Sequence, residues 1–306
     1  MSRILQTLLD SLTVGSLYGL IALGYTMVYG ILQFINFAHS DIFMLGAWFS
    51  FELSKTFGWS KNPPPFWAAP LVLILAMTLC GAVGFTIERL AYKPLRKAPR
   101  LNVLITAIGV SLLIENVGQL PWALGTQPQS MPTLINDRVL FSILGVGFHL
   151  VDLLVIGVAF ALMVVLQWLV YGTKLGLGMR AVSFDTKTAS LMGINVDAVI
   201  SFTFVTGSAL AAAAGLLFAL KYSGLKQSAD SQWVLLGLKA FVAAVVGGIG
   251  NVRGAVLGGL MIGAIEQFGA AYVYAPLRDV YVFSVLILVL LVKPTGLLGK
   301  AVVEKV

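Results

Sequence analysis

Several polar and ionisable side chains lie inside long apolar runs, where such groups are costly. They are Glu52, Glu115, Asn116, Lys239, Glu266 and Gln267. A charged side chain at the centre of a membrane helix costs roughly 2.5–3.5 kcal/mol on an insertion scale, so such residues usually face a partner, the bundle interior or water. We expect Lys239 and Glu266 to pair. Two roles stay open for these residues: polar contacts between helices, or the lining of a path for a polar solute.

Motifs of enzymatic chemistry are absent from the sequence. It contains no GxxxxGK[ST] phosphate loop, no HExxH zinc pair and no GxSxG nucleophile elbow. The two histidines, His39 and His149, are far apart in the chain, so a metal site would need Asp or Glu ligands to converge on them. A Ser/His pair such as Ser111 with His39 stays as an alternative on a weak signal. We therefore expect neither enzyme activity nor a cofactor.

A polar break separates two apolar runs near the N-terminus. In GSLYGLIALGYTMVYGILQFINFAHSDIFMLG, the residues Gln33, Asn36, His39 and Asp41 interrupt the apolar pattern. Lipid cannot hydrogen-bond a peptide group, so such a break is tolerated at membrane depth only inside protein or beside a watery cavity. A second break, GGIGNVRG with Asn251, has a similar layout. Paired breaks are typical of repeat-built transporters, and coincidence in a glycine-rich chain explains the similarity equally well.

The composition is that of an integral membrane protein. Of 306 residues, 58% are hydrophobic and only 11% are charged, whereas soluble domains carry about 25% charged residues. The apolar runs predict an all-α, polytopic helical bundle, a single domain over 1–306 with about eight or nine transmembrane spans. Two short runs flanked by glycine-rich breaks, 38–54 and 233–248, could instead be re-entrant half-helices. The predicted spans are 11–32, 38–54, 66–87, 102–123, 150–170, 196–220, 233–248, 254–272 and 279–293.

Basic residues predict the orientation, because short loops rich in Lys and Arg stay on the cytoplasmic side. The densest cluster follows the third predicted span: Arg89, Lys93, Arg96, Lys97 and Arg100. Alternation then places 124–149 and 221–232 outside, and 172–195 and the C-terminal tail inside. The net charge of +7 does not predict nucleic-acid binding, since no basic helix or aromatic-basic pattern is present.

The inner segment 172–195, GTKLGLGMRAVSFDTKTASLMGIN, is too polar to span a membrane. Its apolar residues Met179, Val182, Ala189 and Met192 can share one side of a short helix, and Gly193 is placed to end that helix. The segment has few basic residues, so docking into a groove on a cytoplasmic partner is favoured over lying on lipid.

Three motifs occur in order with intact spacing. They are GSLYGLIALGYTMVYGILQFINFAHSDIFMLGA, then GMRAVSFDTKTASLMGIN followed by FTFVTGSALAAAAGLL, and then GLKAFVAAVVGGIGNVRGAVLGGLMIGAIE. With these motifs the chain resembles, over nearly its whole length, the LivH-type permease subunit of branched-chain amino acid ABC importers. Ser40 stands where glycine is expected after NFAH, and a serine can fill such a turn at negative φ. Urea and short-amide importers have closely similar permeases, so they remain the alternative for the substrate.

The resemblance implies a multi-pass permease of the bacterial inner membrane. Its partners would be a second LivM-like permease, two cytoplasmic ATPase subunits that hydrolyse the ATP, a periplasmic solute-binding protein and membrane lipid. A self-sufficient channel or carrier and a membrane enzyme remain competing classes. The segment that couples to the ATPase would include Arg180, Ala181, Asp185, Ala189 and Gly193. The candidates for the translocation path, from the resemblance and from the residues above, are Asn36, His39, Asp41, Glu115, Asn116, Lys239, Asn251 and Glu266.

Overall fold

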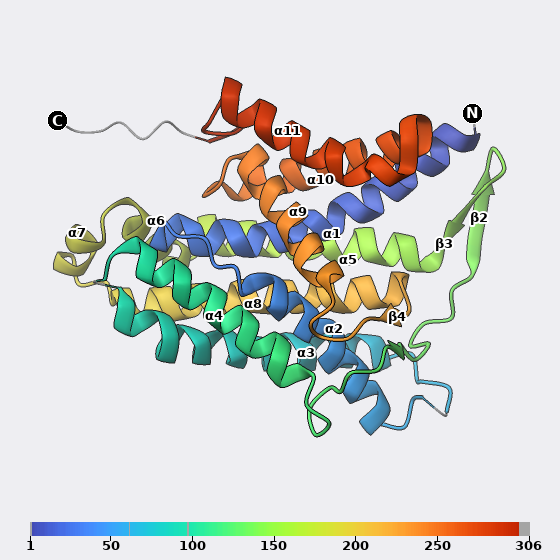
Figure 1. Cartoon of the computed structure of the whole chain (residues 1–306), viewed down its shortest axis with the longest axis horizontal. Coiled ribbons are helices and arrows are strands. Elements are labelled where there is room, and N and C mark those ends of the chain that lie inside the picture. Colours follow the sequence, from blue (N-terminus) through green and yellow to red (C-terminus); the bar gives the residue numbers. More distant parts are fainter. Residues whose placement is uncertain (1, 61, 97, 300–306) are drawn as a thin grey trace.

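Long helices that run mostly side by side make up the computed structural model, which describes residues 2–60, 62–96 and 98–299 (Figure 1). Lys97 and the tail from residue 300, which the charge argument places inside, lie outside these ranges. The longer helices are α1 (Ser2–Leu32), α2 (His39–Thr56), α3 (Ala68–Ile87), α4 (Arg100–Gly118), α5 (Leu150–Gly172), α8 (Val196–Lys221), α9 (Ser231–Gly247), α10 (Val252–Gly269) and α11 (Arg278–Val292). The shorter elements are α6 (Lys174–Phe184), α7 (Thr186–Leu191), β1 (Gln129–Ser130), β2 (Val139–Ile143), β3 (Val146–His149) and β4 (Gly224–Leu225).

Each predicted span coincides with one of the longer helices, so the prediction of a polytopic all-α bundle is confirmed. In the described part of the chain, 6 helical stretches are long and apolar enough to cross a membrane. The last of them, Val252–Val292, holds both α10 and α11, and an extended residue at Tyr274 (φ −159°) interrupts it between these two helices. The two spans that the sequence marks as short, α2 and α9, do not belong to this set.

Contacts between loops agree with the predicted alternation of sides. At one end of the bundle, β1 and β4 pair in antiparallel register, Gln129 with Leu225, and so join two loops that are both predicted to be outside. At the other end, Lys93 and Arg96 both form ion pairs with Asp197, which joins the predicted inner basic loop to the first turn of α8, directly after the inner segment 172–195. The β2–β3 hairpin extends from the outer end (Figure 1).

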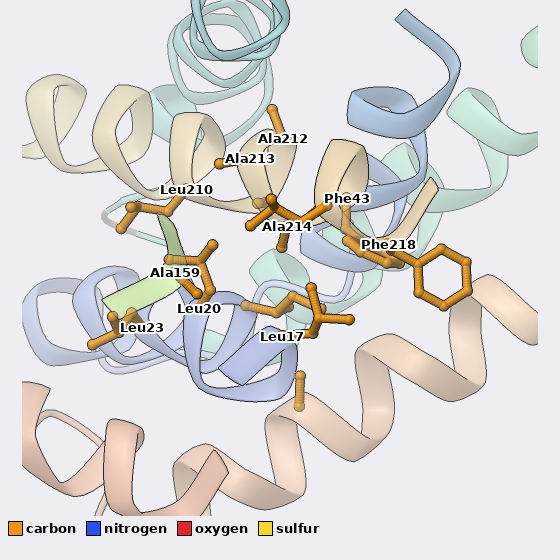
Figure 2. Close-up of a cluster of buried hydrophobic side chains, with 14 of the residues drawn as sticks. Leu17, Leu20, Leu23, Phe43, Ala159, Leu210, Ala212, Ala213, Ala214 and Phe218 are labelled. Carbon is orange, nitrogen blue, oxygen red and sulfur yellow. The ribbon is translucent and has the colours of Figure 1, made fainter. Parts of the chain in front are cut away.

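The centre of the bundle is formed by α1 and α8. Their most apolar stretches are 83% and 78% buried, whereas that of α4 is only 17% buried, so α4 lies at the periphery. Small residues allow close approach of the backbones: a Cβ added at Gly15 would lie 2.9 Å from the Cα of Leu260 on α10. Figure 2 shows Leu17 and Leu20 of α1 between that helix and α8, whereas Ala212 lies on the opposite side of α8, which packs against Gly46 of α2.

Candidate transport site

The predicted break between α1 and α2 lies deep inside the bundle. After α1 the chain turns at Gln33, which has a positive φ of 53°, and α2 begins at His39. The His39 ring lies against Gly24 of α1, where a Cβ would overlap it. Gly24 is eight residues before Leu32, which corresponds to about 12 Å along the helix. The segment 33–38 therefore leads the chain back towards the middle of α1, as a re-entrant element does.

Buried polar atoms without partners gather at this break. Within residues 2–60, 62–96 and 98–299, seven buried side-chain N or O atoms have no hydrogen-bond partner, and five of these belong to Thr26, Asn36, His39 and Asp41. The side chain of Asp41 is completely buried, and both its carboxylate oxygens are unpartnered. A buried polar group left unpaired costs about 1–3 kcal/mol. Such a concentration suits a place where a polar solute supplies the missing contacts.

A cavity of about 430 Å³ adjoins the break, between the start of α2, α4 and α9. Glu115 lines it and lies close to the carboxyl group of Asp41. Most of the wall is apolar. The full lining is Tyr25, Ile35, Phe37, Ser40, Ile108, Ser111, Leu112, Glu115, Val234, Leu238 and Phe241. The cavity can therefore hold an aliphatic group beside polar ones.

The contacts of Asn116 and Ser111 decide whether these two residues, which the sequence analysis singled out, have the roles considered there. Asn116 is exposed and its amide donates to the carbonyl of Leu112 on its own helix, so it does not join the cavity. Ser111 lines the cavity, but Nε2 of His39 has no hydrogen-bond partner, so the described residues form no Ser/His catalytic pair.

The predicted pair of Lys239 and Glu266 is confirmed. Lys239 Nζ lies 2.8 Å from Oε1 of Glu266 and 2.6 Å from Oδ1 of Asp279. The hydroxyl of Tyr18 donates to the other oxygen of Glu266 at 2.7 Å. This cluster joins α1, α9, α10 and α11, and it borders a second cavity of about 280 Å³. Its groups are therefore held largely by one another.

Asn251 does not occupy a place like that of Asn36. Its Oδ1 accepts hydrogen bonds from the N–H groups of Arg253 and Gly254 at 3.0 and 3.3 Å, so it caps α10. Its amide donates to the carbonyl of Leu298. The neighbouring Gly250 lies beside Gly30, at the end of α1. The two breaks therefore differ in depth, and the idea that they occupy corresponding positions is not supported by their surroundings.

The inner segment contains two helices, α6 and α7, so the prediction of one short helix is wrong. The reason is local: Asp185 is extended and its carboxylate accepts the N–H of Lys187 at 2.8 Å, which caps a new helix. The hydroxyl of Thr188, and then the N–H groups of Thr188 and Lys187, hold the pKa of Asp185 below its usual value. Gly193 ends α7 in the left-handed region with φ 82°, as the sequence predicts.

The segment has one buried face and one exposed face. Met179, Val182 and Ala189, which the sequence places on one side of a helix, are buried within this chain, but Met192 is 78% exposed because it follows the end of α7. With Phe184 and Leu191, each 87% exposed, it forms an apolar surface at the inner end of the bundle. Of the other candidates here, Ala181 is half-buried, and Arg180 is exposed and stacks over Tyr171 at 5.4 Å.

A group of residues that sequence reasoning missed connects α3 to α8. Glu88 is completely buried, forms an ion pair with Arg96 and accepts the hydroxyl of Ser201 at 2.7 Å. The buried hydroxyl of Tyr92 donates to Oδ1 of Asn36 at 2.6 Å. A signal was present, because Glu88 is an acidic residue at the start of a strongly basic loop.

A helical bundle with a re-entrant break, unpartnered polar groups inside it and an exposed apolar surface at one end has the features expected of a membrane permease. Residues 7–292 match the family model described as branched-chain amino acid transport system / permease component. The chain belongs to this family.

Similar proteins span almost the whole chain. It is 42% identical to the high-affinity branched-chain amino acid transport system permease protein BraD of Pseudomonas aeruginosa, over 99% of this chain and 98% of that protein. It is 39% identical to LivH of Escherichia coli, a permease protein of the same description, over 99% of this chain and 97% of that protein. A probable LivH of Methanocaldococcus jannaschii is 28% identical over 92% of this chain and 88% of that protein.

Proposed function

We propose that this chain is one permease subunit of an ATP-driven importer for leucine, isoleucine and valine. It forms a single transmembrane domain in the bacterial inner membrane. A second LivM-like permease completes the path, two cytoplasmic ATPase subunits supply the energy, and a periplasmic binding protein delivers the solute. The main support is the family and the substrates named for the relatives. The chain contributes no nucleotide-binding motif of its own.

The observation that favours an amino acid over urea is the cavity at the α1–α2 break. A branched-chain amino acid has an aliphatic side chain and a charged head, and it gains from a site with apolar walls and a few polar groups. Leu112, Leu238 and Phe241 offer the apolar wall, while Glu115 lines the cavity beside the buried Asp41. Urea is small and has no apolar part, so it does not need this wall.

Transport follows from a change that starts at the inner segment. The exposed apolar surface of Phe184, Leu191 and Met192 fits a groove on an ATPase subunit. When ATP closes the ATPase pair, the movement displaces α6 and α7, and the bundle shifts between an outward-open and an inward-open state. ATP achieves this only by its different affinity for the two states of the assembly.

Uptake of labelled leucine and labelled urea tests this proposal. Both are measured in cells that lack the gene and in cells with the gene restored, each with an active and an inactive ATPase partner. Loss and rescue of leucine uptake alone, abolished by the inactive ATPase, supports the proposal. Rescue of urea uptake instead changes the substrate but keeps the mechanism. Leucine uptake that persists with the inactive ATPase identifies a self-sufficient carrier and contradicts the proposal.

A further inference from the structure

A wide helical turn at the inner end of α3 holds two buried polar side chains. Residues Glu88–Tyr92 form a π-helix that continues α3 directly. Glu88 and Tyr92 are 0% and 1% exposed, whereas Arg89 and Leu90 between them are exposed. Single π-turns inside helices are rare and are found frequently at functional sites. The contacts of these two buried side chains decide what this turn does.

Glu88 connects the turn to the start of α8. It forms an ion pair with Arg96 and accepts the Ser201 hydroxyl at 2.7 Å. Arg96 and Lys93 each contact Asp197 at 2.5 Å. Asp197 and Ser201 are four residues apart and therefore lie on one face of α8. Removing one partner from such a buried cluster leaves an uncompensated charge, so α3 and α8 are held together as one unit at this point.

The start of α8 is joined closely to the inner segment. The N–H of Ile194 donates to the carbonyl of Ala189 at 3.1 Å, and Oδ1 of Asn195 accepts the N–H of Ala198 at 3.0 Å. Only residues 192–195 separate α7 from α8. With so short and hydrogen-bonded a connection, a displacement of α7 also displaces Asp197.

Tyr92 connects the same turn to the break. Its hydroxyl donates to Oδ1 of Asn36 at 2.6 Å, and its ring packs between Phe34 and Phe204 with ring centroids 5.3 and 5.5 Å away. Asn36 lies in the segment that leads to His39 and Asp41, where Nε2 of His39 and the carboxylate oxygens of Asp41 have no hydrogen-bond partner. The wide turn thus contacts the break on one side and α8 on the other.

We propose that Glu88 and Tyr92 are positioning residues for transport, which transmit displacement of the inner segment to the α1–α2 break. This inference rests on the proposed function, because it assumes that partner ATPases move α6 and α7. The path of contacts runs from Asp197 through Arg96 to Glu88, and from Tyr92 of the same π-turn to Asn36. Coupling between distant sites is carried by packed and hydrogen-bonded elements of this kind, provided that they shift as units.

The test uses the complete importer in proteoliposomes and a cysteine that reports on the cavity. Leu112→Cys supplies the reporter, since Leu112 lines the cavity and Cys80, the only native cysteine, is buried. A charged methanethiosulfonate reagent labels it with and without a non-hydrolysable ATP analogue. We expect the labelling rate to change about fivefold or more between these states, and Tyr92→Phe to abolish most of that change.

A matched tyrosine provides the control. Tyr281→Phe removes a hydroxyl that donates to the carbonyl of Tyr274 at 3.2 Å in an exposed hydrogen bond of a half-buried residue, and it should leave the labelling change intact. A second readout is leucine imported per ATP hydrolysed, which should fall about fivefold in Tyr92→Phe and in Asp197→Asn. In the double variant the fall should be no larger than in either single variant, because both break one path.

The outcomes distinguish failure of this inference from failure of the proposed function. The proposal that Glu88 and Tyr92 transmit this displacement would be overturned by either of two results. One is a fall in leucine imported per ATP that multiplies in the double variant, and the other is unchanged labelling and stoichiometry in Tyr92→Phe. If Asp197→Asn does not assemble, Lys93→Gln takes its place, since it removes one of the two cations on Asp197. Absence of ATP-dependent leucine uptake in the unaltered importer would instead refute the proposed function, which keeps the two failures distinct.

Discussion

This bundle holds two groups of buried polar residues. The first group is paired within the chain, whereas the second keeps buried atoms without a hydrogen-bond partner. Around Lys239, opposite charges and a hydroxyl meet at 2.6–2.8 Å, so the buried charges of this cluster compensate one another. At the α1–α2 break, the side chains of Asp41 and His39 keep buried atoms without a partner among the residues that the structure describes. Buried polarity alone therefore does not identify a transport site in a membrane bundle. The break differs from the cluster around Lys239 because its unpartnered buried atoms can form hydrogen bonds with a polar solute.

The largest effect on stability is expected at the satisfied cluster. Lys239→Met leaves the carboxylates of Glu266 and Asp279 without their shared cation, and breaking a buried pair in this way costs about 3–5 kcal/mol. The measurement is thermal unfolding of the purified permease in detergent. Lys55→Met is the control, since Lys55 is 60% exposed and its ion pair with Glu52 is worth about 0–1 kcal/mol. Normal stability together with lost uptake would move Lys239 into the translocation path.

A smaller loss is expected when one hydrogen bond of the same cluster is removed. Tyr18→Phe keeps the ring and deletes the hydroxyl that donates to Glu266, and a hydrogen bond to a charged group is worth about 1.5–3 kcal/mol. Unfolding measurements should show this loss, with Tyr281→Phe as the control, since the hydrogen bond of the Tyr281 hydroxyl is exposed. Equal stability of both variants would contradict the view that the cluster is held by its own members.

The break should respond in the opposite way. Asp41→Asn keeps the shape of the side chain and breaks no ion pair among the described residues, so stability should change by less than about 1 kcal/mol. Leucine uptake should nevertheless fall about tenfold, which corresponds to roughly 1.4 kcal/mol. Asp10→Asn, at a partly exposed position of α1, is the control. Unaltered uptake in Asp41→Asn would remove this carboxylate from the proposed path.

The smallest effect concerns the capping residue of α7, which lies outside both groups. Because hydrogen bonds lower the pKa of Asp185 in the folded protein, its contribution is present above the unfolded pKa and is lost as the pH falls through the folded pKa. Asp185→Ala should lower leucine imported per ATP at neutral pH while the protein still reaches the membrane. Gly193→Pro should do the same, because proline cannot adopt the positive φ found there.

A conservative variant isolates the cap at Asp185. Asparagine caps helices about as well as aspartate, so Asp185→Asn should keep coupled uptake and should not lose it in acid. Equal coupling in Asp185→Ala and Asp185→Asn, both at the level of the unaltered protein, would remove Asp185 from the coupling segment.

Much of the fold could be predicted because membrane helices are determined by local hydropathy. The runs that predict 196–220 and 150–170 became α8 and α5 almost residue for residue. The pair of Lys239 and Glu266 was also predictable, because opposite charges in apolar runs have few other ways to be satisfied. The split of 172–195 was missed although its cause, the capping sequence Asp185–Thr188, is local.

The remaining features depended on contacts between distant segments. Asn36 and Asn251 look alike in the sequence, but one lies beside Tyr92 inside the bundle and the other caps α10. Glu88 accepts the hydroxyl of Ser201, which lies 113 residues further along the chain, and no local sequence pattern reveals such a contact.

The sequence by itself determined that this chain is a helical membrane protein, where its helices lie and where its first helix must break. Hydropathy and backbone hydrogen bonding act over a few residues, so they can be read along the chain. Only the tertiary structure decided which buried polar groups are satisfied by the protein and which are left free. That outcome depends on whether a complementary group from a distant helix reaches the same point in space. Glu266 reaches Lys239 in this way, whereas Glu115, the neighbour of Asp41, is itself acidic, and the carboxylate oxygens of Asp41 stay without a hydrogen-bond partner among the described residues.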